Sequence, residues 1–347
     1  MKNNVNRYGN IDGLRAFAAI GIILMHVFYN GQYSITGPII SVIARAGLLT
    51  RLFFIISGFG MCCGYYEKIK NNQISINKFY NKRYLKILPF FAVLVFLDLG
   101  VSAITGTLGF KSIYEGFSDL TLLFGFLPAG NIEVVGVGWT LGVIFAFYCL
   151  FPFFVYMIWT KKRAWFFFVI GLVFCYLCQF CFVADGRAVS CNILRWLCYF
   201  IAGGLIYLYR DRIKDIISAH RIIWLLAVLI LSVVWFVSPH EIMGFNISAI
   251  KDTAVFSLWL CYAISVESKI LNNKINRFIS DVSFEIYLSH MFVFRIFEKL
   301  RLIHLTKSDI ISYVITVLFV ILGTTLFAYV VKKLLNKMLL NKMLKIK

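Results

Sequence analysis

The sequence predicts an all-α, polytopic transmembrane helical bundle of about ten spans. Of its 347 residues, 61% are hydrophobic and only 15% are charged, whereas soluble domains are about 45–50% apolar and about 25% charged. Its apolar residues gather in runs that approach the roughly 20 residues a helix needs to cross a bilayer. The Lys and Arg residues lie mostly between alternate runs. We therefore treat residues 1–347 as a single integral membrane domain.

In the interval 107–136, Pro128 and nearby glycines indicate a loop or a half-buried segment. Residues 39–49 are expected to form a short helix along the outer surface. The ten predicted spans are residues 13–30, 50–66, 86–106, 137–159, 164–184, 193–209, 221–238, 246–266, 280–298 and 310–331.

The distribution of cations supports an even number of spans with both termini in the cytoplasm. With the N-terminus inside, the inner segments hold 24 of the 35 Lys and Arg residues and the outer segments hold ten, with Arg15 at the inner edge of the first span. Cytoplasmic loops of membrane proteins carry such an excess. We therefore expect a multi-pass protein of the inner, or cytoplasmic, membrane. The basic segment 332–347 is expected to lie as an amphipathic tail on the anionic inner leaflet.

The net charge of +19 does not indicate nucleic-acid binding, because the cations lie between apolar runs and form no basic domain. The nine cysteines do not indicate a metal site either. Cys175, Cys178 and Cys181 share one helix face, but no second cysteine pair or histidine lies near them. We interpret them as small buried hydrophobic residues.

The first apolar run carries Arg15 at the membrane edge and His26 within the span. Ionisable residues inside a span are costly, so a functional role is the default interpretation. The alternatives are an arginine that snorkels to the interface and a histidine bonded to a backbone carbonyl. Asp12 or Asn10 is expected to cap the start of the helix, and Asp12 is also a candidate partner that orients Arg15.

The spacing of Arg15 and His26 favours a shared role. Eleven residues at about 100° each make three turns and about 20°, so both side chains lie on nearly the same helix face. They stand roughly 16 Å apart along the axis, which is comparable to the reach of a pantetheine arm. We expect Arg15 to hold phosphates at the cytoplasmic mouth and His26, beyond mid-membrane, to take a proton from a hydroxyl nucleophile.

Five segments between residues 10 and 290 carry a resemblance to a known family. They are GLRAFAAIGIILMHV at 13–27, LFFIISGFGM at 52–61, KFYNKRYLKILPFF at 78–91, GWTLGVIFAFYCLFPFF at 138–154 and SFEIYLSH at 283–290. In this order they resemble the motifs of acyltransferase family 3, membrane proteins that include O-acetyltransferases of surface glycans. The resemblance implies acetyl-CoA or another acyl-CoA as co-substrate, with no bound cofactor.

The resemblance also implies roles for residues outside the first helix. Arg83 and Lys86 are expected to contact the phosphates of CoA, although ordinary positive-inside flanking explains them equally well. Ser57 is expected to line the site or to let helices approach closely. Trp139 and Tyr148 line the site or anchor at the interface. Being nine residues apart, they face opposite sides of a helix, so at least one is expected to point inward.

The sequence also departs from the family pattern. Many members carry one or two Glu residues after the tryptophan, where this chain has Ile144 and Phe145. Glu285, where the family more often has a small polar residue, is a candidate substitute, and His290 in the same motif is expected to line the site. Lys86 replaces an arginine, which keeps the charge but loses the fork that grips phosphate through two hydrogen bonds.

These observations predict a membrane O-acyltransferase with His26 and Arg15 as catalytic residues. It would move an acyl group, with acetyl expected from family frequency, from a cytoplasmic CoA donor to a hydroxyl of a cell-surface or lipid-linked glycan. The alternative is a transporter or flippase of a lipid-linked sugar or small molecule. Transporters usually show matching halves with broken helices, and the sequence shows no such repeat. The acceptor, the acyl length and the oligomeric state stay open.

Overall fold

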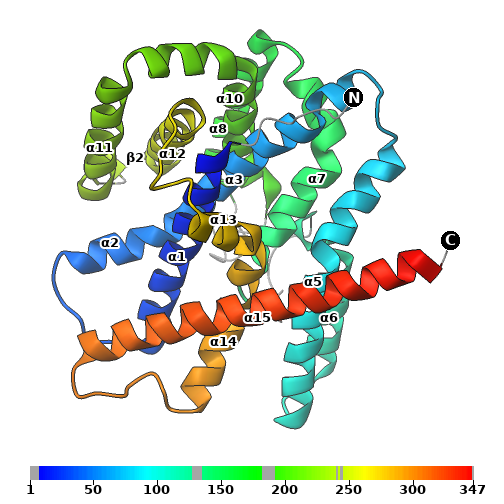
Figure 1. Ribbon diagram of the computed structural model, residues 1–347, viewed down its shortest axis with the longest axis vertical. Coiled ribbons are helices and arrows are strands. Elements are labelled where there is room, and N and C mark those ends of the chain that lie inside the picture. The colour runs from blue at the N-terminus through cyan, green and yellow to red at the C-terminus, as the bar shows by residue number, and fades with distance from the viewer. Residues whose placement is uncertain (1–7, 127–134, 182–191, 240, 243–244, 346–347) are drawn as a thin grey trace.

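The computed structural model describes residues 8–126, 135–181, 192–239, 241–242 and 245–345. Most of them lie in helices (Figure 1). The strands within this described part form one antiparallel hairpin of two residues each, β1 (Glu241–Ile242) and β2 (Phe245–Asn246). The predicted all-α class is therefore confirmed.

The N-terminal part forms one long helix and then a continuous helical stretch, Ile39–Lys70, that changes helix type along its length. Residues 39–49, predicted as a short helix, are indeed helical. The expected span 50–66 continues from α3 through a π-helical turn, η2, into α4. The elements are α1 (Gly9–Gly31), α2 (Ile39–Arg45), η1 (Ala46–Leu48), α3 (Leu49–Met61), η2 (Cys62–Tyr66) and α4 (Glu67–Lys70).

The central part departs from the sequence prediction at two helices. α5 begins ten residues before the predicted span 86–106, because the Ser75 hydroxyl caps it by accepting a hydrogen bond from the Lys78 amide at 3.3 Å. The interval 107–136, expected as a loop or half-buried segment, contains helix α6 packed against α5. Pro128 lies outside the described residues. The elements are α5 (Ile76–Ile104), α6 (Phe110–Thr121), η3 (Leu123–Phe126), α7 (Trp139–Met157) and α8 (Lys161–Cys181).

The C-terminal part contains a sharp bend and a very long final helix. α10 and α11 meet at His220 with an angle of 101°. α15 continues without a break through the segment 332–345, so that segment extends the last span and is not a separate element (Figure 1). The elements are α10 (Ile193–Ala219), α11 (Arg221–Val237), α12 (Ser248–Ser265), α13 (Lys274–Asp281), α14 (Ser283–Lys299) and α15 (Asp309–Lys345).

Within the described residues, six helical stretches are long and apolar enough to cross a membrane, or seven if the bent pair α10 and α11 counts as one span. α11 and α14 have 17 residues each, which is short for a bilayer core of about 30 Å. Helices capable of spanning a membrane are thus present, while the number of about ten and the sides of the termini stay predictions.

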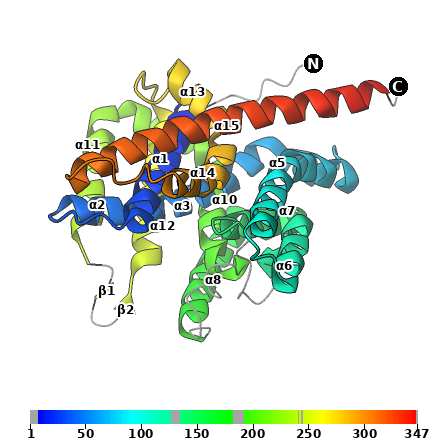
Figure 2. The ribbon, with the colours of Figure 1, turned by 90° about the horizontal axis from the view of Figure 1, so that it is seen from below.

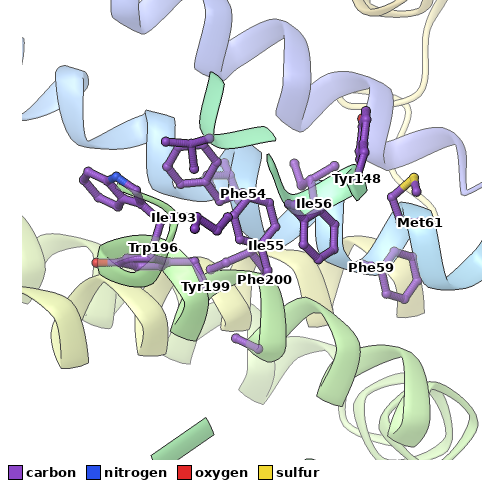
Figure 3. Close-up of a cluster of buried hydrophobic side chains, with 14 of the residues drawn as sticks. Phe54, Ile55, Ile56, Phe59, Met61, Tyr148, Ile193, Trp196, Tyr199 and Phe200 are labelled. Carbon is purple, nitrogen blue, oxygen red and sulfur yellow. The ribbon is translucent and has the colours of Figure 1, made fainter. Parts of the chain in front are cut away.

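The core forms where α3 and α10 pack face to face. Figure 3 shows Phe54 of α3 beside Trp196 and Phe200 of α10, with ring centroids 5.3 and 5.2 Å apart. The backbones approach so closely that a Cβ on Gly58 would overlap the carbonyl oxygen of Phe200. Small residues permit such contacts between membrane helices. The close contact falls on Gly58 and not on Ser57, its neighbour, which faces a pocket described below.

We expect Gly58→Ala to destabilise the protein by about 1–3 kcal/mol, because the methyl group must displace a backbone carbonyl in a packed interface. Thermal denaturation of the detergent-solubilised protein measures the loss. Gly100→Ala is the matched control, since a Cβ at Gly100 meets nothing within 4 Å. Equal stability of the two variants would contradict this packing.

A buried ion pair joins α3 to α12. Arg51 pairs with Asp252, whose side chain is fully buried. The indole nitrogen of Trp235 in α11 donates to the same carboxylate at 2.6 Å. Charged groups inside a membrane bundle need such partners. This network joins α3, α11 and α12. α10 packs against α3, α8 and α12, so these helices form one packed unit (Figure 2).

The start of α1 is held by contacts with distant segments. The helix begins at Gly9, after Tyr8, with no side-chain cap, so the prediction that Asp12 or Asn10 caps it is wrong. Asn10 instead donates to the carbonyl of Ala263 at 3.0 Å. Asp12 accepts a hydrogen bond from Ser280 at 2.8 Å. Asn10 therefore fixes α1 against the end of α12, and Asp12 fixes it against α13.

Candidate active site

A pocket of about 320 Å³ opens between α1, α3, α5, α7, α13, α14 and α15. Its volume lies in the range of small-molecule sites, about 300–1,000 Å³. Five residues predicted for the site line it, namely Arg15, Ser57, Lys86, Tyr148 and Glu285. These residues come from five different helices, so the tertiary fold brings together positions that lie far apart in the sequence.

Charged side chains gather at one end of this pocket. Arg15, Lys86 and Lys332 supply positive charge from α1, α5 and α15, and Glu285 and Asp281 supply negative charge. The ammonium of Lys332 lies 2.8 Å from a carboxylate oxygen of Glu285. The guanidinium of Arg15 lies over α3, 3.7 Å from the position a Cβ would take at Gly60. We call this region the charged end of the pocket.

The pocket extends away from the charged end along α3 and α7. On α3 its lining runs from Ser57 to Thr50, and on α7 from Tyr148 to Thr140. At about 1.5 Å per residue, these stretches cover on the order of 10 Å. Apolar side chains, including Phe53, line the passage between the two ends. The shape suits an extended ligand with an anionic group at one end.

His26 and His290 form a hydrogen-bonded pair beyond the far end of the pocket. The Nδ1 atom of His26 lies 2.7 Å from the Nε2 atom of His290, and the two rings are nearly parallel. His290 is fully buried, while His26 is partly exposed. α1 and α14, which carry them, pack against each other.

The backbone of α14 decides which nitrogen of each ring carries a proton. The Nδ1 atom of His290 lies 2.6 Å from the carbonyl oxygen of Tyr287. A carbonyl oxygen only accepts, so this nitrogen donates, and a neutral imidazole then offers a lone pair at Nε2. His26 must donate from its Nδ1 to that lone pair. The Nε2 atom of His26 is consequently left as a proton acceptor.

Tyr287 connects the pocket with the histidine pair. Its ring lines the pocket beside Phe53, with ring centroids 6.1 Å apart. The same ring lies 5.8 Å from that of His290, and its carbonyl holds His290. Neither His26 nor His290 is among the residues that line the pocket. The pocket therefore ends one aromatic ring short of the pair.

The other predicted site residues also lie outside the lining. Arg83 donates to the hydroxyl of Tyr65 at 2.7 Å, and its guanidinium stacks over the rings of Tyr65 and Tyr148 at 4.7 and 5.5 Å. Arg83 thus adjoins the pocket through Tyr148. Trp139 packs on Trp196, with ring centroids 5.5 Å apart, while Asp12 holds Ser280.

Sequence reasoning did not single out Lys332, Tyr287 and Thr140. Lys332 was grouped with the cations of the C-terminal segment. Thr140 and Tyr287 lie inside segments quoted for their family resemblance, and both line the pocket. A polar residue directly after Trp139 and an aromatic residue one turn before His290 were the available signals. Nothing near Lys332 in the sequence distinguishes it from Lys333.

A family model described as an acyltransferase domain matches residues 8–333. The chain belongs to acyltransferase family 3. This membership makes it an enzyme that transfers acyl groups other than aminoacyl groups, so acyl transfer replaces the transporter alternative. The comparisons with curated proteins and with solved structures gave no match.

Proposed function

We propose that this acyltransferase moves an acyl group, most simply acetyl, from cytoplasmic CoA to a hydroxyl of a cell-surface or lipid-linked glycan. The observation that carries the proposal is the hydrogen-bonded pair of His26 and His290. In this pair, His290 orients the imidazole of His26, whose neutral Nε2 atom lies near an elongated pocket. General bases of this kind typically act on hydroxyl nucleophiles.

The charged end of the pocket suits the donor. Arg15 and Lys86 bring basic side chains to this end, and phosphate groups are the natural ligands of such side chains. Arg83 supports this end by stacking on Tyr148. With the phosphates at the charged end, the pantetheine arm follows α3 and α7 towards Tyr287, and the thioester approaches His26.

The reaction then needs one proton carrier. The acceptor hydroxyl gives its proton to the Nε2 atom of His26 as its oxygen bonds to the thioester carbonyl carbon. When the tetrahedral intermediate collapses, the carbon–sulfur bond breaks and the leaving thiolate takes the proton from His26. The products are an O-acyl ester and CoA. The proposed steps use no bound cofactor or metal.

We further propose that the protein lies in the inner membrane with a defined orientation. The excess of Lys and Arg in alternate segments favours both termini in the cytoplasm, which puts the charged end of the pocket on the cytoplasmic side. His26 then lies towards the outer side, where the glycan acceptor is available. An acyl group delivered to His26 would therefore have crossed much of the membrane along the pocket.

Mass analysis of surface glycans from cells with and without the gene tests this function. We expect a mass shift of one acetyl unit on a defined sugar. In parallel, the purified protein in lipid nanodiscs should release free CoA from acetyl-CoA in the presence of that glycan. Unchanged glycans, together with no thiol release from any acyl-CoA supplied, would contradict the proposal.

A further inference from the structure

Lys332 occupies a position unlike that of the neighbouring cations of α15. It lines the charged end of the pocket together with Leu335 and Asn336. Its ammonium contacts Glu285 at 2.8 Å and also donates to the carbonyl oxygen of Asp281. Lys333, the next residue, is exposed and lies beside the ring of Tyr329. The helix therefore directs one lysine into the pocket and the next one away from it.

The environment of Glu285 favours its contact with Lys332. Its side chain is 7% exposed, and a buried carboxylate needs a compensating charge. It lies in the first turn of α14, where the helix dipole also stabilises an anion. Its second oxygen has no hydrogen-bond partner within the described residues. The carboxylate is thus held at a fixed place on the pocket wall, with one oxygen against the ammonium of Lys332.

We infer that Lys332 is a donor-binding residue and that Glu285 is the positioning residue that holds its ammonium at the charged end. The ligand class is a phosphate-bearing acyl thioester, so the inference rests on the proposed function. An ammonium has three hydrogen-bond donors. Glu285 and the Asp281 carbonyl take two of them, which leaves one for a phosphate oxygen.

The surrounding charges support this assignment. Lys86 lies close enough to Arg15, Glu285 and Lys332 for their charges to act on it. Arg15, Lys86 and Lys332 approach the charged end from three different helices, α1, α5 and α15. A group with several phosphate oxygens can contact cations on different sides. A single carboxylate cannot reach all three sides, so the arrangement favours a polyanion.

Isothermal titration of the full-length protein in detergent with coenzyme A tests the inference. We expect Lys332→Gln to raise the Kd for coenzyme A about tenfold, which is the effect of one lost charge-assisted contact. Binding of pantetheine, which has no phosphate, should change less than twofold because the contact is absent. Lys332→Arg should retain most of the affinity, and Lys333→Gln, the matched control, should bind like the unmodified protein.

A double variant separates ligand binding from simple charge neutralisation. If Lys332 only neutralises Glu285, then Glu285→Gln combined with Lys332→Gln should restore the affinity for coenzyme A, and that result would overturn the inference. If Lys332 binds phosphate, the double variant should bind as weakly as Lys332→Gln. Glu285→Gln alone should weaken binding less than Lys332→Gln, because the lysine is still present.

Different results would contradict the proposed function and the role of Lys332. If the unmodified protein binds neither coenzyme A nor acetyl-CoA, the proposed function fails. If it binds coenzyme A and Lys332→Gln binds it equally well, only the role of Lys332 fails. Monodisperse Lys332→Gln with an unchanged unfolding temperature shows that reduced affinity does not arise from misfolding.

Discussion

Replacing His26 with alanine is expected to lower kcat for acyl transfer by about three orders of magnitude, the loss that follows removal of a general base. The KM for acetyl-CoA should change little, because the side chain does not line the donor pocket. Steady-state assays with acetyl-CoA and the glycan acceptor measure both constants. The variant should still insert into the membrane and accumulate normally, since His26 is partly exposed and its loss leaves the packing of α1 intact.

His304→Ala is the control for this experiment, because His304 is exposed and lies away from the pocket, next to Tyr33. It should retain full activity. Substantial acyl transfer by well-folded His26→Ala would show that another group takes the proton of the hydroxyl. The base assignment would then be wrong even though the family membership holds.

The fold class and helix α1 could be predicted from the sequence because both depend on local patterns. The thickness and the apolar interior of the bilayer determine the length and the composition of the helices that cross it. The positions of Arg15 and His26 on one helix face follow from helix geometry alone. The start of α5 shows where such rules fall short, because it lies ten residues before the predicted span 86–106 and is set by the capping hydroxyl of Ser75.

The arrangement of the candidate site could be predicted only in part. Family motifs pointed to His290 and Glu285, but not to their partners. The contact of His290 with His26 depends on the register of α14 against α1, which no local pattern specifies. The contact of Lys332 with Glu285 likewise depends on how α15 crosses α14 (Figure 1). In the sequence, Lys332 is one cation among several in a basic segment, and charge counting assigns all of them to the inner leaflet.

His290→Phe is expected to cause a second large loss of kcat for acyl transfer, because His290 orients the imidazole of His26. Phenylalanine keeps a ring in the fully buried site but removes the nitrogen that accepts from Nδ1 of His26. The imidazole of His26 then loses its fixed tautomer and orientation. Loss of the partner that orients a metal-ligating histidine costs about 10–100-fold. By analogy we expect kcat to fall by about 100-fold while the KM for acetyl-CoA stays within a factor of about two.

His290→Gln distinguishes orientation from packing. The side-chain oxygen of glutamine can reach the position of Nε2 and accept the hydrogen bond from His26, although glutamine fills the cavity less well than phenylalanine. Recovery of activity by the glutamine variant, despite its poorer packing, would identify the hydrogen bond as the feature that matters. If phenylalanine instead retained activity and glutamine lost it, His290 would be a packing residue. The proton acceptor at His26 would then be set by some other contact, because the tautomer argument depends on the chain of bonds from the Tyr287 carbonyl through His290.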